Sequence, residues 1–123
     1  MRSYSCKEIA EITRGILKGS VDGQISNVII DSRKFSETDN TIFFAIKGER
    51  NDGHDYIPEL IRKGLRYFVV QHSSLAERFP GAVFIIVEDT LNALQKLAAA
   101  VRRDFKGTLI SITGSNGKTI VKE

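Results

Sequence analysis

Apolar and polar positions alternate along this chain in two periods, one typical of strands and one typical of helices. Short runs rich in β-branched and aromatic residues predict extended segments at 16–18, 25–31, 41–46, 67–70 and 83–87. The stretches between them carry apolar residues at helical spacing or polar caps, and they predict helices at 5–15, 56–63, 73–79 and 90–105. Because strand and helix alternate throughout, the pattern predicts an α/β layered fold.

The first and last of these helices carry the clearest local signals. Ser3 or Ser5 is a candidate N-cap for the first helix, and Glu8 is spaced to complete a capping box with Ser5. Asp89 or Thr90 is a candidate cap for the last helix. Apolar residues at helical spacing predict the buried stripe of that helix: Leu91, Leu94, Leu97, Ala98 and Val101.

Composition narrows the class of protein. The chain has 123 residues, enough for one domain and a piece of a second. Its net charge of +3 includes no long basic run, so we expect no nucleic-acid partner. No apolar run approaches the roughly 18 residues that span a bilayer, and the N-terminus lacks the apolar core of a signal peptide. With its single Cys6, this predicts a cytoplasmic protein without membrane insertion or disulfides.

The C-terminal stretch 108–123 has the order of a phosphate-binding loop. A short apolar run leads into a turn that contains Gly114 and Gly117 and ends in Lys118 and Thr119. Glycines let backbone N–H groups face an anion, while a lysine reaches phosphates and a hydroxyl suits Mg²⁺. The strict pattern needs a glycine where Ile112 stands. An ordinary strand–turn–helix joint is therefore an alternative.

The sequence stops four residues after Thr119, too soon for a second compact domain. We therefore expect a piece of a longer protein, with a domain boundary near Glu88. Because the strand within 108–123 would lack the sheet of its own domain, we expect that stretch to be poorly ordered or paired with a neighbouring chain.

Two polar segments follow predicted strands. Asp31, Ser32 and Arg33 end the strand at 25–31, and residues 47–54 form a polar, glycine-containing loop after the strand at 41–46. Polar residues at strand ends of α/β folds commonly face a ligand crevice. The alternatives are that Asp31 only turns the chain and that 47–54 is a solvated connector. A turn or capping role is expected for His54, since two histidines and one cysteine cannot build a metal cluster.

Three stretches together resemble the Mur ligase family. D-S-R at 31–33 and I-F-F-A-I-K-G-E-R-N-D-G-H at 42–54 resemble the N-terminal domain of these ligases, and I-T-G-S-N-G-K-T at 112–119 resembles their ATP loop, which also lacks the outermost glycine. The order and spacing match over nearly the whole chain. The resemblance implies a small layered α/β UDP-binding domain at 1–88. A helix and the first strand and phosphate loop of a P-loop-type ATPase domain would follow at 89–123.

The resemblance also implies an activity. Mur ligases join an amino acid or dipeptide to a UDP-N-acetylmuramoyl peptide with ATP and Mg²⁺, through an acyl phosphate. The stretch V-E-D-T-L-N-A-L-Q-K-L-A at 87–98 and the terminal V-K-E look most like the members that add D-alanyl-D-alanine in peptidoglycan synthesis. Some such proteins are fused to an alanine racemase. Since other domains hold the remaining catalytic groups, we expect no ligase activity from this chain alone.

By position, the resemblance assigns two sets of binding residues. The UDP-substrate set is Ile30, Ser32, Arg33, Glu49, Arg50, Asn51, Asp52, Gly53 and His54. The ATP set is Gly114, Ser115, Asn116, Gly117, Lys118 and Thr119. Within it, Lys118 would hold the β- and γ-phosphates and Thr119 would bind Mg²⁺.

Other functions remain as alternatives. The related ligase that adds the third amino acid shares the motifs, and a non-catalytic nucleotide-sugar binding module would explain residues 1–88 alone. A folylpolyglutamate synthase would lack the D-S-R and D-G-H domain. A small P-loop NTPase would carry its phosphate loop near its first strand, whereas here the loop comes last.

Overall fold

The computed structural model describes residues 4–19, 23–34, 40–48, 52–103 and 111–113. Its strands are β1 (Tyr4–Ser5), β2 (Ile16–Lys18), β3 (Gln24–Ile25), β4 (Asn27–Ile29), β5 (Thr41–Phe44), β6 (Tyr67–Val70), β7 (Val83–Ile86) and β8 (Ser111–Thr113). Its α-helices are α1 (Cys6–Thr13), α2 (Ile57–Arg62), α3 (Ser74–Arg78) and α4 (Thr90–Arg103), and its 3₁₀-helices are η1 (Ser32–Lys34) and η2 (Gly53–Tyr56).

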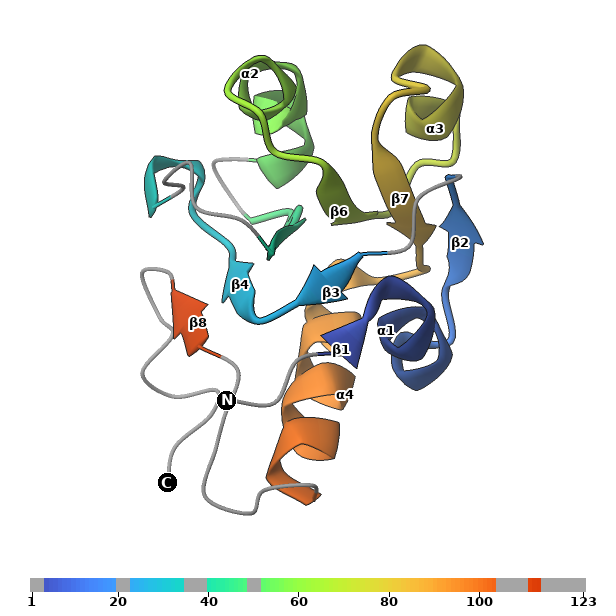
Figure 1. The fold of residues 1–123 in the computed structure, drawn as a ribbon, viewed down its shortest axis with the longest axis vertical. Coiled ribbons are helices and arrows are strands. Elements are labelled where there is room, and N and C mark those ends of the chain that lie inside the picture. The colour runs from blue at the N-terminus through green and yellow to red at the C-terminus, as the bar shows by residue number, and fades with distance from the viewer. Residues whose placement is uncertain (1–3, 20–22, 35–39, 49–51, 104–110, 114–123) are drawn as a thin grey trace.

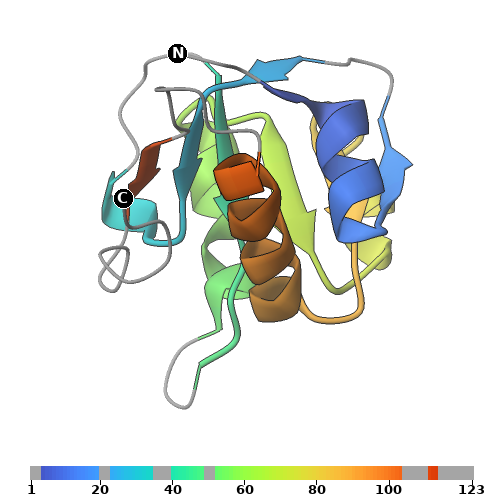
Figure 2. The same cartoon turned by 90° about the horizontal axis from the view of Figure 1, so that it is seen from below.

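Six strands form one sheet in the order β2-β7-β6-β5-β4-β8. All neighbouring pairs are parallel except β2 with β7, and β1 and β3 form a separate antiparallel pair. Helices α2 and α3 cover one face of the large sheet, and α1 and α4 lie together on the other (Figures 1 and 2). The predicted α/β layered fold is confirmed.

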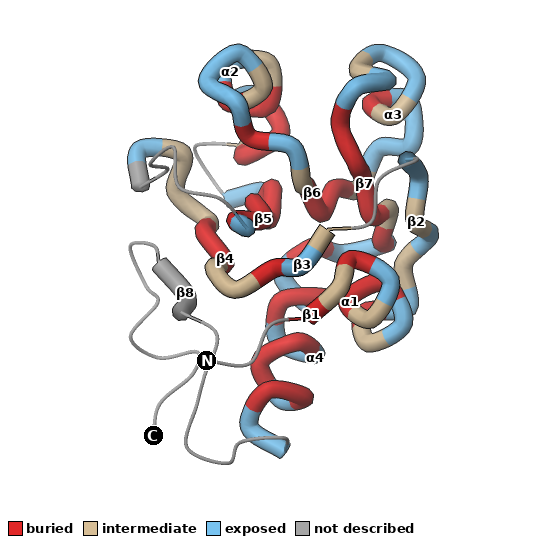
Figure 3. The backbone as a smooth tube through the Cα atoms, viewed as in Figure 1, coloured by how far each residue is buried: buried red, intermediate tan, exposed pale blue. Residues whose placement is uncertain are grey.

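The sheet separates two apolar cores, and its strands contribute to both. Between the sheet and α1 and α4, the buried side chains include Ile9, Leu94 and Leu97. The opposite core includes Leu60 and Phe68. Buried residues accordingly run through the strands and along the sheet-facing side of α4 (Figure 3). No helix in the described part of the chain has the length and apolar character needed to cross a bilayer.

Local capping follows the sequence closely. Ser5 accepts a hydrogen bond from the Glu8 amide at 3.0 Å, and the Glu8 carboxylate accepts one from the Ser5 amide at 2.8 Å. The predicted capping box is therefore confirmed. Of the two candidate caps for the last helix, Asp89 accepts the amides of Leu91 and Asn92 at 2.9 and 3.2 Å. Leu91 departs from the predicted stripe, because it is 47% exposed.

The expectation that 108–123 is poorly ordered or paired with a neighbouring chain is wrong for Ser111–Thr113. These residues form β8, which pairs in parallel with β4 of the same chain. The physical reason is that β4 otherwise presents a sheet edge, whose unpaired N–H and C=O groups accept another strand. The predicted ATP loop, 114–119, lies outside the described residues. The boundary near Glu88 stays a prediction, although α4 beyond it packs against α1.

Candidate functional site

The register of the parallel strands brings the two predicted substrate segments to one edge of the sheet. Ile29 pairs with Phe43, Phe44 pairs with Val69, and the carboxyl ends of β4, β5 and β6 therefore lie side by side. Asp31 to Lys34 follow β4, and the described residues 45–48 and 52–54 follow β5. This edge, outside the carboxyl ends of parallel strands, is where open α/β sheets bind ligands.

Beyond β4, Asp31 organises the turn and holds an arginine. Its Oδ1 accepts the Arg33 amide at 3.0 Å and Arg33 Nε at 3.1 Å, while its Oδ2 accepts Arg33 Nη2 at 2.9 Å. Arg33 remains 84% exposed at its side chain. Hydrogen bonding to Asp31 raises the pKa of Arg33, with a smaller contribution from Tyr56 of η2.

Beyond β5, the D-G-H segment begins η2 and folds back on the strand. Asp52 caps η2 by accepting the His54 amide at 3.0 Å, and the Gly53 amide donates to the Ile46 carbonyl at 2.9 Å. His54 is only 8% exposed. Its ring Nδ1 lies 2.6 Å from Asp52 Oδ1, and its Nε2 accepts the Gln71 amide at 2.9 Å. The expected turn role of His54 is confirmed, since it lies within η2, while the capping side chain is that of Asp52.

Opposing effects set the pKa of Asp52. Partial burial raises it, but hydrogen bonds from the backbone amide and the ring of His54, together with attraction to Lys47, outweigh the effect of burial. The net result is a pKa below the ordinary value for an aspartate. The Asp52 carboxylate is therefore stabilised as an anion in the folded chain.

Gln71 and Thr90, which the sequence did not single out for the site, extend these contacts. Gln71 Oε1 accepts the Thr90 amide at 3.0 Å, and the Thr90 hydroxyl donates to the Ala45 carbonyl at 2.8 Å. The side chains link the ends of β5, β6 and the start of α4, so the partners lie far apart in sequence. The only sequence signal was the placement of polar residues directly after apolar strands. We call the set Ala45, Asp52, His54, Gln71 and Thr90 the His54 network.

The remaining predicted substrate residues divide into two groups. Ile30 is partly buried against the core shared with α1 and α4, and Ser32 is partly exposed at the start of η1. Glu49, Arg50 and Asn51 lie outside the described residues. Since the described ends of their loop are at the same edge as Ser32, the structure is compatible with one site formed by both segments.

Asp52, His54 and His72 place potential metal-ligand atoms within 4.8 Å of one another. Both ring nitrogens of His54 are already engaged, one with Asp52 and one with the Gln71 amide. Metal binding would break at least one of these bonds. Among the described residues, this group is therefore better explained as a hydrogen-bonded structure than as a metal centre.

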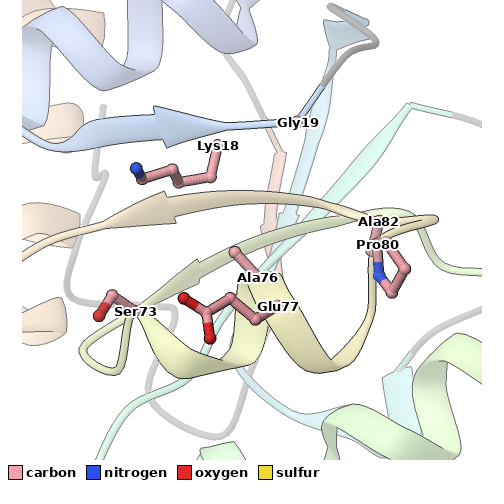
Figure 4. A pocket seen from close by; sticks show the side chains of 7 residues that line it. All are labelled: Lys18, Gly19, Ser73, Ala76, Glu77, Pro80 and Ala82. Atoms are coloured by element: carbon pink, nitrogen blue, oxygen red, sulfur yellow. The ribbon is translucent and has the colours of Figure 1, made fainter.

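A separate hollow of about 470 Å³ lies beside β2. Lys18 and Gly19 line one side, and Ser73 and Glu77 line the other (Figure 4). It contains none of the residues predicted to bind substrate or ATP, and we assign it no ligand.

Comparison with known proteins decides the family. Residues 24–102, more than half of the chain, match the family described as "Mur ligase family, catalytic domain". The chain belongs to the Mur ligase family. The matched range contains D-S-R and D-G-H, so the resemblance carried by these two motifs is confirmed.

Individual Mur ligases show how much of such a protein this chain represents. It is 39% identical to the UDP-N-acetylmuramoyl-tripeptide–D-alanyl-D-alanine ligase of Buchnera aphidicola, over 100% of this chain and 26% of that relative. It is 38% identical to the UDP-N-acetylmuramoyl-L-alanyl-D-glutamate–2,6-diaminopimelate ligase of Clostridioides difficile, over 85% of this chain and 21% of that relative. The chain thus spans about a quarter of the length of the curated relatives it matches.

The fold agrees with a solved Mur ligase. The structure of UDP-N-acetylmuramoylalanyl-D-glutamyl-2,6-diaminopimelate–D-alanyl-D-alanyl ligase from Acinetobacter baumannii has a TM-score of 0.73 against this chain. The likeness covers 85% of this chain and 22% of that one, at 24% identity. At that identity, it establishes the fold alone.

Proposed function

We propose that this chain is the nucleotide-substrate-binding part of an ATP-dependent, ADP-forming ligase that adds D-alanyl-D-alanine to a UDP-N-acetylmuramoyl tripeptide in peptidoglycan synthesis. The observation that carries the proposal is the meeting of the D-S-R and D-G-H segments at the carboxyl edge of one parallel sheet. Family membership and the relative from Buchnera aphidicola support the reaction. The absence of a membrane-crossing helix among the described residues is compatible with a cytoplasmic location.

In this proposal, the edge beyond β4 and β5 holds the UDP end of the substrate. Ile30 packs against the base, and Ser32, Arg33 and residues 49–51 contact the uridine or diphosphate. Asp52, Gly53 and His54 shape the loop that carries 49–51. Because Asp31 already forms a bidentate pair with Arg33, the guanidinium is held in one direction before a ligand arrives.

The reaction requires groups from both proposed domains. ATP transfers its γ-phosphoryl group to the peptide carboxylate, releasing ADP. The amine of D-alanyl-D-alanine then attacks the acyl phosphate and displaces phosphate. Residues 114–119 would hold ATP, with Lys118 at the β- and γ-phosphates and Thr119 on Mg²⁺; such transfer depends on positioning and charge neutralisation. We expect this chain alone to be inactive, and ATP-dependent ligation by it would refute that expectation.

The first test is titration of the chain with UDP and, separately, with Mg-ATP by calorimetry. We expect UDP binding without ATP binding. Ser32→Ala should weaken UDP binding by about tenfold if the hydroxyl bonds a phosphate. The matched substitution Ser73→Ala, at an exposed serine before α3, should leave it unchanged. Tight ATP binding without UDP binding would overturn the assignment of the substrate site.

A second candidate is the related ligase that adds the third amino acid, which the similarity to the Clostridioides difficile protein favours. The full-length protein distinguishes the two. Phosphate release should require UDP-N-acetylmuramoyl tripeptide and D-alanyl-D-alanine. Turnover with the dipeptide substrate and diaminopimelate or lysine would assign the alternative instead.

A further inference from the structure

Asp31 contacts Arg33 in two different ways. One contact belongs to the turn after β4: Asp31 Oδ1 accepts the Arg33 amide at 3.0 Å, a bond that aspartate and asparagine both form in turns. The other belongs to the side chains: Oδ1 accepts Arg33 Nε at 3.1 Å, and Oδ2 accepts Nη2 at 2.9 Å. The turn needs only one carboxylate oxygen, so it does not explain the bond from Oδ2 to the guanidinium.

The two side chains of this pair differ in exposure. The Asp31 side chain is 14% exposed, whereas that of Arg33 is 84% exposed. The carboxylate is therefore the part packed against the protein, and the guanidinium is the part presented to solvent. An ion pair at such a surface adds little to stability, because water screens the charges. What the bidentate pair does is select one direction for a long side chain that would otherwise sample many rotamers.

The guanidinium keeps hydrogen-bonding capacity after it has paired with Asp31. An arginine side chain carries N–H donors on Nε, Nη1 and Nη2 in one planar fork. Asp31 accepts from the edge formed by Nε and Nη2, so the edge formed by Nη1 and Nη2 is directed away from the carboxylate. No described residue accepts a hydrogen bond from Nη1. Two parallel donors on such an edge match two oxygens of a phosphate.

We propose that Asp31 is a positioning residue for the nucleotide substrate: it holds Arg33 so that the Nη1–Nη2 edge of the guanidinium meets the diphosphate and not the base. This inference rests on the proposed function and refines it, since it assigns Arg33 to one part of the ligand and gives Asp31 a role that acts through Arg33. An arginine already held in its binding direction loses less side-chain entropy when the ligand arrives.

Positioning and charge predict opposite results when Asp31 is neutralised. By charge alone, the Asp31 carboxylate repels a diphosphate, so its removal would strengthen UDP binding. Asp31→Asn isolates the positioning role, because the side-chain oxygen still accepts the amide of the turn while the new NH₂ group cannot accept Arg33 Nη2. In the complete 123-residue chain, we expect this substitution to weaken UDP binding by about tenfold in calorimetry. Uridine binding, followed by NMR shifts, should not change.

Three further measurements separate positioning from general effects. In an Arg33→Ala background, Asp31→Asn should weaken UDP binding no further, because a positioning residue acts only through the group that it holds. Glu59→Gln removes the carboxylate of another exposed ion pair, 3.3 Å from Lys63, and should leave UDP affinity unchanged. Without ligand, the Arg33 Nε–H signal should exchange slowly with water in the unsubstituted chain and faster in Asp31→Asn.

Each outcome decides between the two roles. Unchanged or stronger UDP binding by Asp31→Asn, an equal loss in the Arg33→Ala background, or an equal loss of uridine binding overturns the positioning role and leaves the proposed function standing. The same holds if the Arg33 Nε–H signal exchanges at one rate in both chains. Failure of the unsubstituted chain to bind UDP overturns the proposed function and the role of Asp31 with it.

Discussion

Gly53 stands where the backbone leaves no room for a side chain. A Cβ built there would lie 2.8 Å from the Ile46 amide nitrogen and 3.0 Å from Ala45 Cα. Both are backbone atoms at the end of β5, so neither can move aside as a flexible side chain would. The glycine in D-G-H is therefore needed for close approach of η2 to the strand.

Gly53→Ala should consequently lower the free energy of unfolding by about 1–3 kcal/mol, the usual range for overpacking. It should also weaken UDP binding, because displacement of η2 moves Asp52 and the end of the segment that follows β5. Urea denaturation measures the first effect. Gly81→Ala is the control, since a Cβ at Gly81 meets no atom within 4 Å. Equal stabilities for the two variants would contradict the packing argument.

The lowered pKa of Asp52 predicts a contribution to acid unfolding. A carboxyl whose folded pKa lies below its unfolded value of about 3.9 stabilises the fold fully above that value, and this contribution is lost as the pH falls through the folded pKa. Asp52→Asn keeps an acceptor oxygen but cannot ionise. Its free energy of unfolding, measured against pH, should therefore fall less steeply below about pH 4 than that of the unsubstituted chain. Parallel curves would show that Asp52 does not contribute.

At the residue scale, the sequence predicted contacts between residues that are a few positions apart in the chain. The Ser5–Glu8 capping box joins residues three apart, so its pattern is visible in the chain. The tie between His54 and Gln71 joins residues seventeen apart and uses a backbone amide, which carries no residue-specific signal. Only the register of β5 and β6 brings that pair together.

At the scale of elements, the sequence predicted the existence of strands better than their partners. The segment 25–31 was predicted as one strand, but β3 pairs with β1 and β4 pairs with β5. The change occurs where the amides of Ser26 and Asn27 both donate to the Asn40 carbonyl. An unbroken apolar run indicates burial, yet it cannot show where a strand exchanges one neighbour for another.

Thr90 joins the start of α4 to the end of β5, and its side chain is almost fully buried. Thr90→Val preserves shape but removes the donor to the Ala45 carbonyl, so we expect a loss of about 1–3 kcal/mol in the free energy of unfolding. Thr13→Val is a matched control at a second buried threonine. The Thr13 hydroxyl donates to the Ile9 carbonyl within its own helix. That carbonyl also accepts a backbone amide, so removal of the Thr13 hydroxyl should lower the free energy of unfolding less than removal of the Thr90 hydroxyl. Thermal denaturation compares the two variants. A larger loss of stability for Thr13→Val than for Thr90→Val would contradict the bridging role of Thr90.

At the scale of the whole molecule, the two edges of the large sheet differ in whether the sequence predicted the strand that lies there. At one edge, β8 pairs with β4. The sequence did not predict this pairing, because it depends on which strand the tertiary fold leaves at the edge of the sheet. At the other, β2 pairs only with β7 among the described strands. Its Ile16 is 61% exposed, so apolar surface lies beside unpaired backbone groups. That combination favours association through strand pairing.

We therefore expect the chain to self-associate weakly at high concentration, and Ile16→Lys to reduce this, because a charge on an edge strand disfavours pairing with a second copy. The substitution is at an exposed position and should change the free energy of unfolding by no more than about 0.5 kcal/mol. Sedimentation velocity over a range of concentrations gives the measurement. Leu91→Lys, which removes a 47% exposed leucine from a helix without a free backbone edge, should have little effect on association. A chain that stays monomeric throughout, or equal effects of the two lysines, would show that β2 does not act as a pairing edge.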